Sequence, residues 1–288
     1  LRSRRTHMRT ALVDLPRREI TATGTYPQVL DQVLAFAMSE DSAADPMEVA
    51  TLVNQVRAAA HDMNRSEYLV LNRAKPRLTY LFLGVNVAVF LLMTFTGGTT
   101  NPVNLVRWGA KYGPLIIDGQ WWRLITPNFI HIGLVHLMFN SLALYVLGPV
   151  VERIYGNGRF LLVYLTSGIL GVSASFAFSP SISAGASAAI FGLFGALLYF
   201  GQNYRNLFFR TMGTEILVLL GINLAFGFFS GGVDNFAHLG GLLGGYLASW
   251  MVGLPERSKW ASRLAGTAAY LLVLALLINI GFKSIPIA

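Results

Sequence analysis

Seven long apolar runs constrain this chain more than any other feature. Each is nearly free of charge and is long enough, or almost long enough, to cross a hydrocarbon core of about 30 Å. They lie near residues 78–95, 129–148, 160–178, 186–201, 214–229, 236–253 and 265–282. Only 12% of the residues are charged, against roughly a quarter in ordinary soluble domains. The sequence therefore predicts an all-α membrane protein with seven transmembrane helices, not a soluble enzyme.

The charged residues divide the chain into two unlike parts. Residues 1–77 hold half of the 22 Lys and Arg residues and most of the 14 Asp and Glu residues. Apolar spacing in this part predicts helices near 28–40 and 47–62. We predict three segments, which are a cytoplasmic helical N-terminal region over 1–76, a six-helix core over 77–254, and a loop with a seventh transmembrane helix over 255–288.

Arginines are frequent among the first residues, and the net charge of the chain is +8. Such a composition also occurs in segments that bind nucleic acids or membrane surfaces. A solvated segment is the simpler explanation, so we expect the lipid bilayer as a partner and no nucleic acid. No apolar run follows these arginines, and the sequence does not predict a cleavable signal peptide.

Positive charges occur on alternate short loops, which predicts the orientation of the helices because cytoplasmic loops accumulate Lys and Arg. The charges on the side shared with the N-terminal region are Arg73, Lys75, Arg77, Arg153, Arg159, Arg205, Arg210, Arg257, Lys259 and Arg263. We therefore expect a cytoplasmic N-terminus and an outer C-terminus, with the cell (inner) membrane as the location. The long loop between the first two helices is the exception, since Arg107, Lys111 and Arg123 must lie outside. We expect that loop to be structured.

Metal and thiol chemistry have little support in this sequence. The chain has no cysteine, which excludes disulfides, thiolate metal sites, haem attachment and cysteine nucleophiles. His131 and His136 are five residues apart, roughly 140° around a helix, and so form a poor pair of metal ligands. We predict no metal and no cofactor.

Four polar residues lie in the outer halves of the second, fourth and sixth apolar runs, namely His136, Asn140, Ser187 and His238. Polar groups inside transmembrane segments are costly and often functional, although interhelical hydrogen bonds alone could explain each of them. A serine becomes nucleophilic when a base takes its proton, and imidazole suits that role. His136, Asn140 and the Ser187 backbone N–H could stabilise the oxyanion of an acyl-transfer reaction.

Glycine spacing predicts that the fourth and sixth helices pack closely. Gly240/Gly244 and Gly241/Gly245 form two overlapping GxxxG pairs, which permit close helix contact. Such packing would bring Ser187 and His238 together. Asp234, one turn before His238, is expected to cap the sixth helix, with orientation of His238 as the alternative.

The ordered set of these residues resembles the rhomboid intramembrane serine proteases over roughly 78–253. The resemblance rests on Trp122-Arg123, His131-x4-His136-x3-Asn140, Glu152-Arg153, Gly185-Ala186-Ser187, Phe191-Gly192 and Ala237-His238-x2-Gly241-x3-Gly245. It implies that Ser187 is the nucleophile and His238 the base of a dyad without an acid. It also implies that His136 and Asn140 help to form the oxyanion hole, and that Phe191 places a ring against the catalytic histidine.

Other features of the sequence are judged against this resemblance. Ala188 stands where the family usually has glycine. The run at 265–282 is similar to the seventh helix of the family's six-plus-one arrangement, and we assign it to packing or regulation. Trp121 and Trp122 fit either an interfacial aromatic belt or a structured, membrane-embedded loop. Glu152 and Arg153 are expected to make structural contacts only.

The resemblance implies a serine endopeptidase that cleaves transmembrane segments of other membrane proteins through an acyl-enzyme. It points to the second and fifth helices and their adjoining loop as the gate through which a substrate reaches the site. The alternative is a non-proteolytic rhomboid-like protein that binds transmembrane segments. A transporter fits less well, because the polar residues gather on one side of the membrane and lack paired charges.

Overall fold

A computed structural model describes residues 10–15, 18–23, 35, 47, 50, 54, 67–255 and 258–284. The chain divides into two compact units, Leu1–Val70 and Leu71–Ala288.

The N-terminal unit contains a strand pair that the sequence analysis did not anticipate. Strand β1 (Thr10–Leu15) pairs antiparallel with β2 (Arg18–Thr23), with Leu15 opposite Arg18. Both strands contain Thr and β-branched residues, which favour strands. The expectation of a purely helical N-terminal region was therefore incomplete. The helices predicted near 28–40 and 47–62 lie mostly outside the described residues, of which 35, 47, 50 and 54 are helical.

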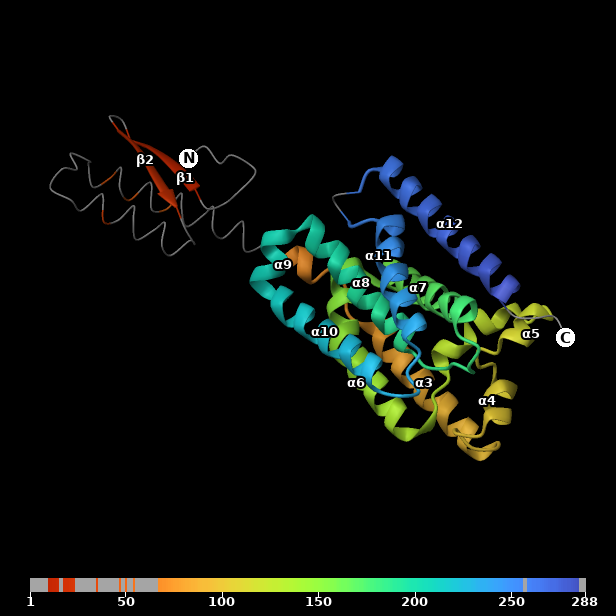
Figure 1. Cartoon of the computed structure of the whole chain (residues 1–288). Coiled ribbons are helices and arrows are strands. Elements are labelled where there is room, and N and C mark those ends of the chain that lie inside the picture. Colours follow the sequence, from red (N-terminus) through yellow and green to blue (C-terminus); the bar gives the residue numbers. More distant parts are fainter. Residues whose placement is uncertain are drawn as a thin grey trace. The chain divides into compact units, whose positions relative to one another are not determined.

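The second unit is a helical bundle, and a helix forms at each of the seven apolar runs (Figure 1). These are α3 (Arg77–Phe95), α6 (Gly133–Tyr155), α7 (Asn157–Phe178), α8 (Ser187–Asn203), α10 (Gly213–Phe229), α11 (Asn235–Val252) and α12 (Trp260–Ser284). The prediction of an all-α membrane bundle for this part of the chain is confirmed.

The helices differ in how well their length and composition suit a membrane crossing. Four of those described, α3, α6, α7 and α12, are long and apolar enough to span a bilayer. A fifth span results if α9 (Arg205–Thr211) and α10, which meet at 75°, count as one. The short α8 and the glycine-rich α11 do not meet this criterion by themselves. Seven complete crossings therefore remain a prediction.

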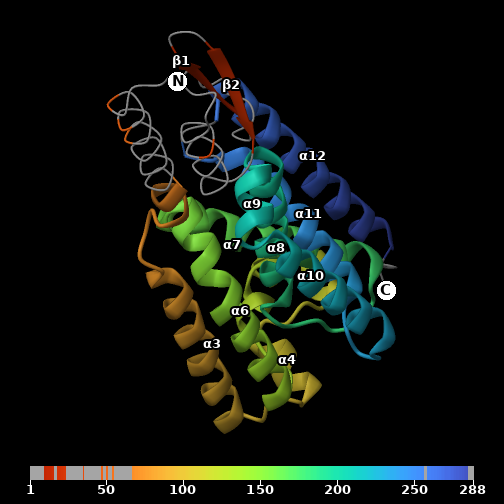
Figure 2. The ribbon, with the colours of Figure 1, turned by 90° about the vertical axis from the view of Figure 1, so that its left-hand side faces the viewer.

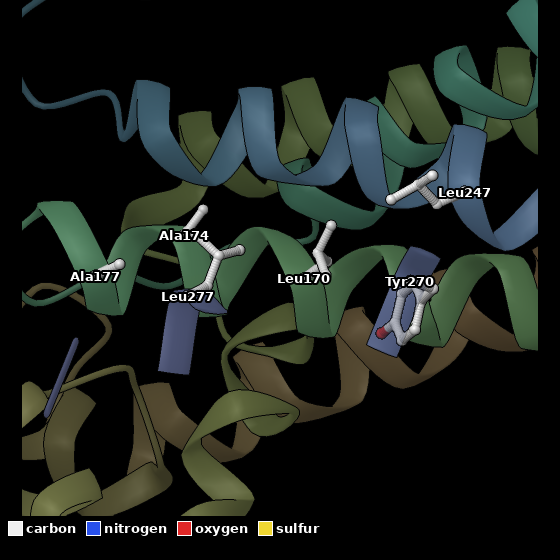
Figure 3. Packing of buried hydrophobic residues seen from close by; sticks show 6 residues of the cluster. All are labelled: Leu170, Ala174, Ala177, Leu247, Tyr270 and Leu277. Atoms are coloured by element: carbon white, nitrogen blue, oxygen red, sulfur yellow. The ribbon is translucent and has the colours of Figure 1, made fainter. Parts of the chain in front are cut away.

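The centre of the bundle consists of α7, α8 and α11. Figure 2 shows α3 beside α6 at one edge of the bundle and α12 beside α11 at another. Most of the side chains of α8 are buried. Helix α12 packs on α7 and α11 through an apolar cluster formed by Leu170, Ala174, Ala177, Leu247, Tyr270 and Leu277 (Figure 3). The seventh helix thus has a packing role, as expected from the sequence.

The two GxxxG pairs of α11 contact two different helices. A Cβ atom on Gly245 would lie 1.8 Å from the Gly192 carbonyl oxygen of α8, so these backbones touch. A Cβ atom on Gly244 would instead lie 2.9 Å from Cβ of Leu170 on α7. The predicted close packing of α8 on α11 is confirmed. The Gly240/Gly244 pair explains how α7 joins them.

The loop between α3 and α6 is structured, as predicted. It contains α4 (Pro102–Trp108), α5 (Gly113–Ile117) and the two 3₁₀ helices η1 (Trp121–Leu124) and η2 (Thr126–Phe129). The buried Arg123 guanidinium donates from Nη1 to the carbonyl oxygens of Val106 and Ala110, at 2.7 and 3.0 Å. Trp121 and Trp122 are about half exposed, and the Trp121 ring lies 5.5 Å from that of Phe282 on α12.

Glu152 makes structural contacts at the other end of α6. Its fully buried carboxylate accepts hydrogen bonds from the backbone N–H groups of Leu78 and Thr79, both at 2.8 Å, and from the Thr79 hydroxyl at 2.7 Å. The Asn157 side chain donates a further bond at 2.6 Å. The carboxylate accepts from N–H groups at the start of α3 that have no partner within the helix. Its negative charge also interacts favourably with the positive end of the α3 dipole.

Candidate active site

Ser187 is the first residue of α8, and an irregular segment leads into it. Gly185 has φ +141°, a conformation that favours glycine. Its N–H donates to the Pro127 carbonyl at 2.9 Å. A Cβ atom at Gly185 would lie 2.6 Å from Cε1 of His136 and 3.6 Å from Oγ of Ser187. The absence of a side chain at Gly185 therefore lets the His136 ring lie close to the serine.

His238 lies in the first turns of α11, with its side chain directed toward α8. Its ring stacks on that of Phe191, with centroids 4.1 Å apart and an angle of 15° between the planes. Phe191 is one turn after Ser187 on α8, so the stacking brings His238 to the part of α8 that begins with the serine. The structure thus places Ser187, His136 and His238 around the junction of α6, α8 and α11.

The hydrogen bonding of the two central residues is incomplete. Among the described residues no hydrogen bond links Ser187 to His238, and the buried Nδ1 atom of His238 has no partner there. Asp234 has a different role, because its carboxylate accepts from the Ala237 N–H at 3.0 Å and contacts the Ser175 hydroxyl. The prediction that Asp234 caps the sixth apolar helix is confirmed.

The two predicted oxyanion-stabilising residues differ in their contacts. The Asn140 side chain is buried and donates to the His136 carbonyl oxygen of its own helix at 2.9 Å. His136 Nδ1 accepts from the Ile132 N–H at 3.4 Å, while the opposite edge of its ring faces Gly185. The structure therefore brings His136 next to Ser187, and it gives one of the two N–H donors of the Asn140 amide a local bond.

His131 contacts the same segment. It is fully buried, its ring lies 5.5 Å from that of His136 in an edge-to-face arrangement, and its Nε2 accepts from the Ala186 N–H at 3.4 Å. Within the described ranges, no group of three or more His, Cys, Asp or Glu side chains is placed to hold a metal ion.

The methyl group of Ala188, where the family usually has glycine, lies between helices. Ala188 is buried, and its Cβ would be 2.7 Å from a Cβ atom on Gly171 of α7. Gly171 has no side chain, so this space accommodates the methyl group. Helix α7 thus leaves room for alanine in place of the family's usual glycine.

In the sequence, Lys111 stands out only as a positive charge that departs from the alternating pattern of the loops. The structure buries its side chain completely in the loop between α3 and α6, where its ammonium group binds the segment before Ser187. A lysine in a loop carries no sequence signal for burial. Only the exception to the charge pattern marked this region.

The fold and the polar cluster together define an integral membrane protein with a serine and two histidines at a buried helix junction. Comparison with known proteins identifies its family, because the family model described as a rhomboid domain matches residues 118–255. The chain is 50% identical over 214 residues to the rhomboid protease GluP of Bacillus subtilis, covering 74% of this chain and 42% of that protein. It is 40% identical over 138 residues to the putative rhomboid protease YdcA of Bacillus subtilis, covering 47% and 69%.

A further match, at 37% identity over 174 residues, is to the rhomboid-like protease 1 of Toxoplasma gondii, covering 56% of this chain and 59% of that protein. The chain belongs to the rhomboid family. It spans less than half the length of the first of these relatives.

Proposed function

We propose that this protein is an intramembrane serine endopeptidase that cleaves transmembrane segments of other membrane proteins. Its relatives named as rhomboid proteases support this reading. The observation that carries it is the stacking of His238 on Phe191, one helical turn from Ser187, in a buried helix junction. A base and a nucleophile held this near one another suit acyl transfer.

In the proposed reaction His238 takes the proton of the Ser187 hydroxyl as the oxygen attacks the substrate carbonyl carbon. The tetrahedral intermediate collapses when His238 gives that proton to the leaving amine, which leaves an acyl-enzyme on Ser187. Water then attacks the ester, again with His238 as base, and releases the carboxylic acid product. His238 has no carboxylate partner at Nδ1 among the described residues, which fits a dyad.

Oxyanion stabilisation is assigned to His136, Asn140 and the backbone N–H of Ser187. The ring edge of His136 already faces the serine across Gly185. The Asn140 amide has a second N–H besides the one bonded to the His136 carbonyl, and this donor would serve the oxyanion. Each such donor is worth roughly 3 kcal/mol of transition-state stabilisation.

Substrates are proposed to reach the site laterally from the bilayer, near α6 and α10. Large apolar side chains on both helices are exposed, among them Val135, Phe139, Phe226 and Phe229. The substrate helix would have to unwind locally, because an intact helix hides its carbonyl groups. In the proposed orientation the N-terminal region is cytoplasmic, and the site opens to the outer side of the cell membrane.

The test is cleavage of a fluorogenic transmembrane peptide by purified protein in liposomes, together with labelling by a fluorophosphonate probe. Ser187→Ala and His238→Ala are each expected to reduce cleavage at least about 1,000-fold, since removing either member of a catalytic pair abolishes its joint effect. Ser249→Ala, at a buried serine of α11, is the control and is expected to keep wild-type activity.

Two results would count against the proposal. One is a folded wild-type protein that cleaves no member of a panel of transmembrane peptides and takes up no probe. It would favour the non-proteolytic alternative, in which the protein binds transmembrane segments. The other is cleavage that persists in Ser187→Ala, which would move the nucleophile elsewhere.

A further inference from the structure

Lys111 is a buried cation that the proposed chemistry does not use. It lies in the outer loop between α4 and α5, outside the membrane-spanning helices, and its side chain is 0% exposed. Removing an ammonium group from water is costly unless hydrogen bonds compensate it. Its binding partners therefore indicate what the burial achieves.

Lys111 holds the segment between α7 and α8 with both its side chain and its backbone. Its Nζ donates to the carbonyl oxygens of Ser179 and Ser181, each at 2.7 Å. Its backbone pairs with Ser183, N–H to carbonyl at 2.8 Å and carbonyl to N–H at 3.1 Å. The backbone at residues 179–183, which forms no helix, is thus fixed from the outer loop.

The same segment continues directly to the proposed nucleophile. The Gly185 N–H donates to the Pro127 carbonyl, and the Ala186 N–H donates to His131. Both partners lie on the N-terminal side of α6. Contacts from outside α8 therefore set the position of Ala186, which precedes Ser187. Among the described residues, Lys111 supplies the only ammonium group in those contacts.

Lys111 is also coupled to the start of the helix that carries His238. The Asp234 carboxylate attracts the Lys111 ammonium, caps α11 and contacts Ser175 at the end of α7. The Asp234 carbonyl oxygen accepts from the His238 N–H at 3.1 Å. The cation therefore binds the segment that precedes Ser187 through hydrogen bonds, and it is attracted by the residue that caps the helix of His238.

Burial lowers the pKa of Lys111 from 10.5 to about 8, and attraction by Asp234 opposes this shift. Of the two other cations in the same loop, Arg123 binds the carbonyl of the neighbouring Ala110, and Arg107 is exposed. Above pH 8 the amine becomes neutral and loses the charge that strengthens its hydrogen bonds. Because the unfolded chain then binds more protons than the fold, rising pH stabilises the fold with respect to this group.

We propose that Lys111 is a positioning residue for acyl transfer, holding residues 179–186 so that Ser187 faces His136 and His238. The proposal rests on the proposed function. Lys111 acts through the backbone before Ser187 and, through Asp234, on the cap of α11. It touches neither the substrate nor the reacting atoms.

The first experiment measures fluorophosphonate labelling of Ser187, and kcat and KM for a fluorogenic transmembrane peptide, in Lys111→Met. We expect labelling and kcat to fall at least tenfold while KM changes less than twofold. Arg107→Met is the matched control, because Arg107 is an exposed cation of the same loop, and it is expected to match wild type. In Lys111→Ala, added ethylammonium is expected to restore labelling at least threefold.

The second experiment follows labelling of wild-type protein from pH 7.5 to 9.5, which needs no variant to fold. We expect the rate to fall at least threefold with a midpoint near pH 8, in a range where deprotonation of Lys111 favours the fold. Folded Lys111→Met should lack this decline. Wild-type labelling in Lys111→Met, or a flat wild-type profile, overturns the inference. Wild-type protein that neither labels nor cleaves instead overturns the proposed function, and the inference with it.

Discussion

The centre and the edge of the bundle are built on different physical principles. In α7, 72% of the apolar window is buried within the protein, against 22% in both α3 and α12. Helix α11 reaches α8 through backbone contact at its glycines, whereas α10 buries only a few of its residues, Gly213, Ile216, Leu220 and Gly227. Ser187 and His238, the proposed nucleophile and base, lie on the central helices α8 and α11.

This difference shows where the bundle has little freedom to move. Backbones in contact have no flexible side chain between them, so α8 and α11 hold a fixed spacing. A helix that presents most of its surface to lipid has fewer contacts to break when it shifts. The arrangement suits an enzyme whose reacting groups must stay in place while a neighbouring helix admits a substrate.

The largest expected effect comes from separating the two central helices. In Gly245→Ala the new methyl carbon would lie 1.8 Å from the Gly192 carbonyl oxygen, and neither backbone has room to yield. We expect the free energy of unfolding to fall by about 3 kcal/mol or more, as measured by denaturation in detergent. In the control Gly221→Ala on α10, nothing lies within 4 Å of the added atom. That variant is expected to change stability by less than about 1 kcal/mol. Equal effects would contradict the contrast.

A second prediction concerns the polar anchor of an edge helix. In Glu152→Gln a side-chain NH₂ group replaces one acceptor oxygen, so either the donors of Leu78 and Asn157 or the two donors of Thr79 lose their partner. We expect a loss of about 2 kcal/mol, typical for buried donors left unsatisfied, in the same denaturation assay. Glu215→Gln is the control, because Glu215 is exposed in the first turn of α10. A loss as large in the control would mean that charge alone is responsible.

The smallest effect on stability is expected at Phe191, which lies on the central helix α8 and stacks on the proposed base His238. Phe191→Leu keeps an apolar side chain but removes the ring stacked on His238. We expect stability to change by about 1 kcal/mol and the rate of fluorophosphonate labelling to fall about tenfold, equivalent to about 1.4 kcal/mol. Phe229→Leu is the matched control on α10, where the ring is 91% exposed. If labelling is unchanged in Phe191→Leu, the stacking does not position the proposed base.

The ordered polar residues of the sequence predicted much of the candidate site. The spacing of His136 and Asn140, and the glycine pairs after His238, depend on helix periodicity, which sequence reveals directly. The burial of Lys111 was not predictable. It depends on the carbonyls of Ser179 and Ser181, which are distant in sequence, and a sequence does not specify their distance in space.

By itself the sequence determined the helices, their apolar runs and the family to which the chain belongs. The helices and the family follow from local composition and from the order of residues along the chain. Tertiary structure alone decided that α11 contacts α7 with one glycine pair and α8 with the other, and that Gly171 accommodates Ala188. It also decided that a lysine in the loop between α3 and α6 binds the segment before Ser187. The physical reason is that these contacts join residues distant in sequence, so they exist only after the helices have packed.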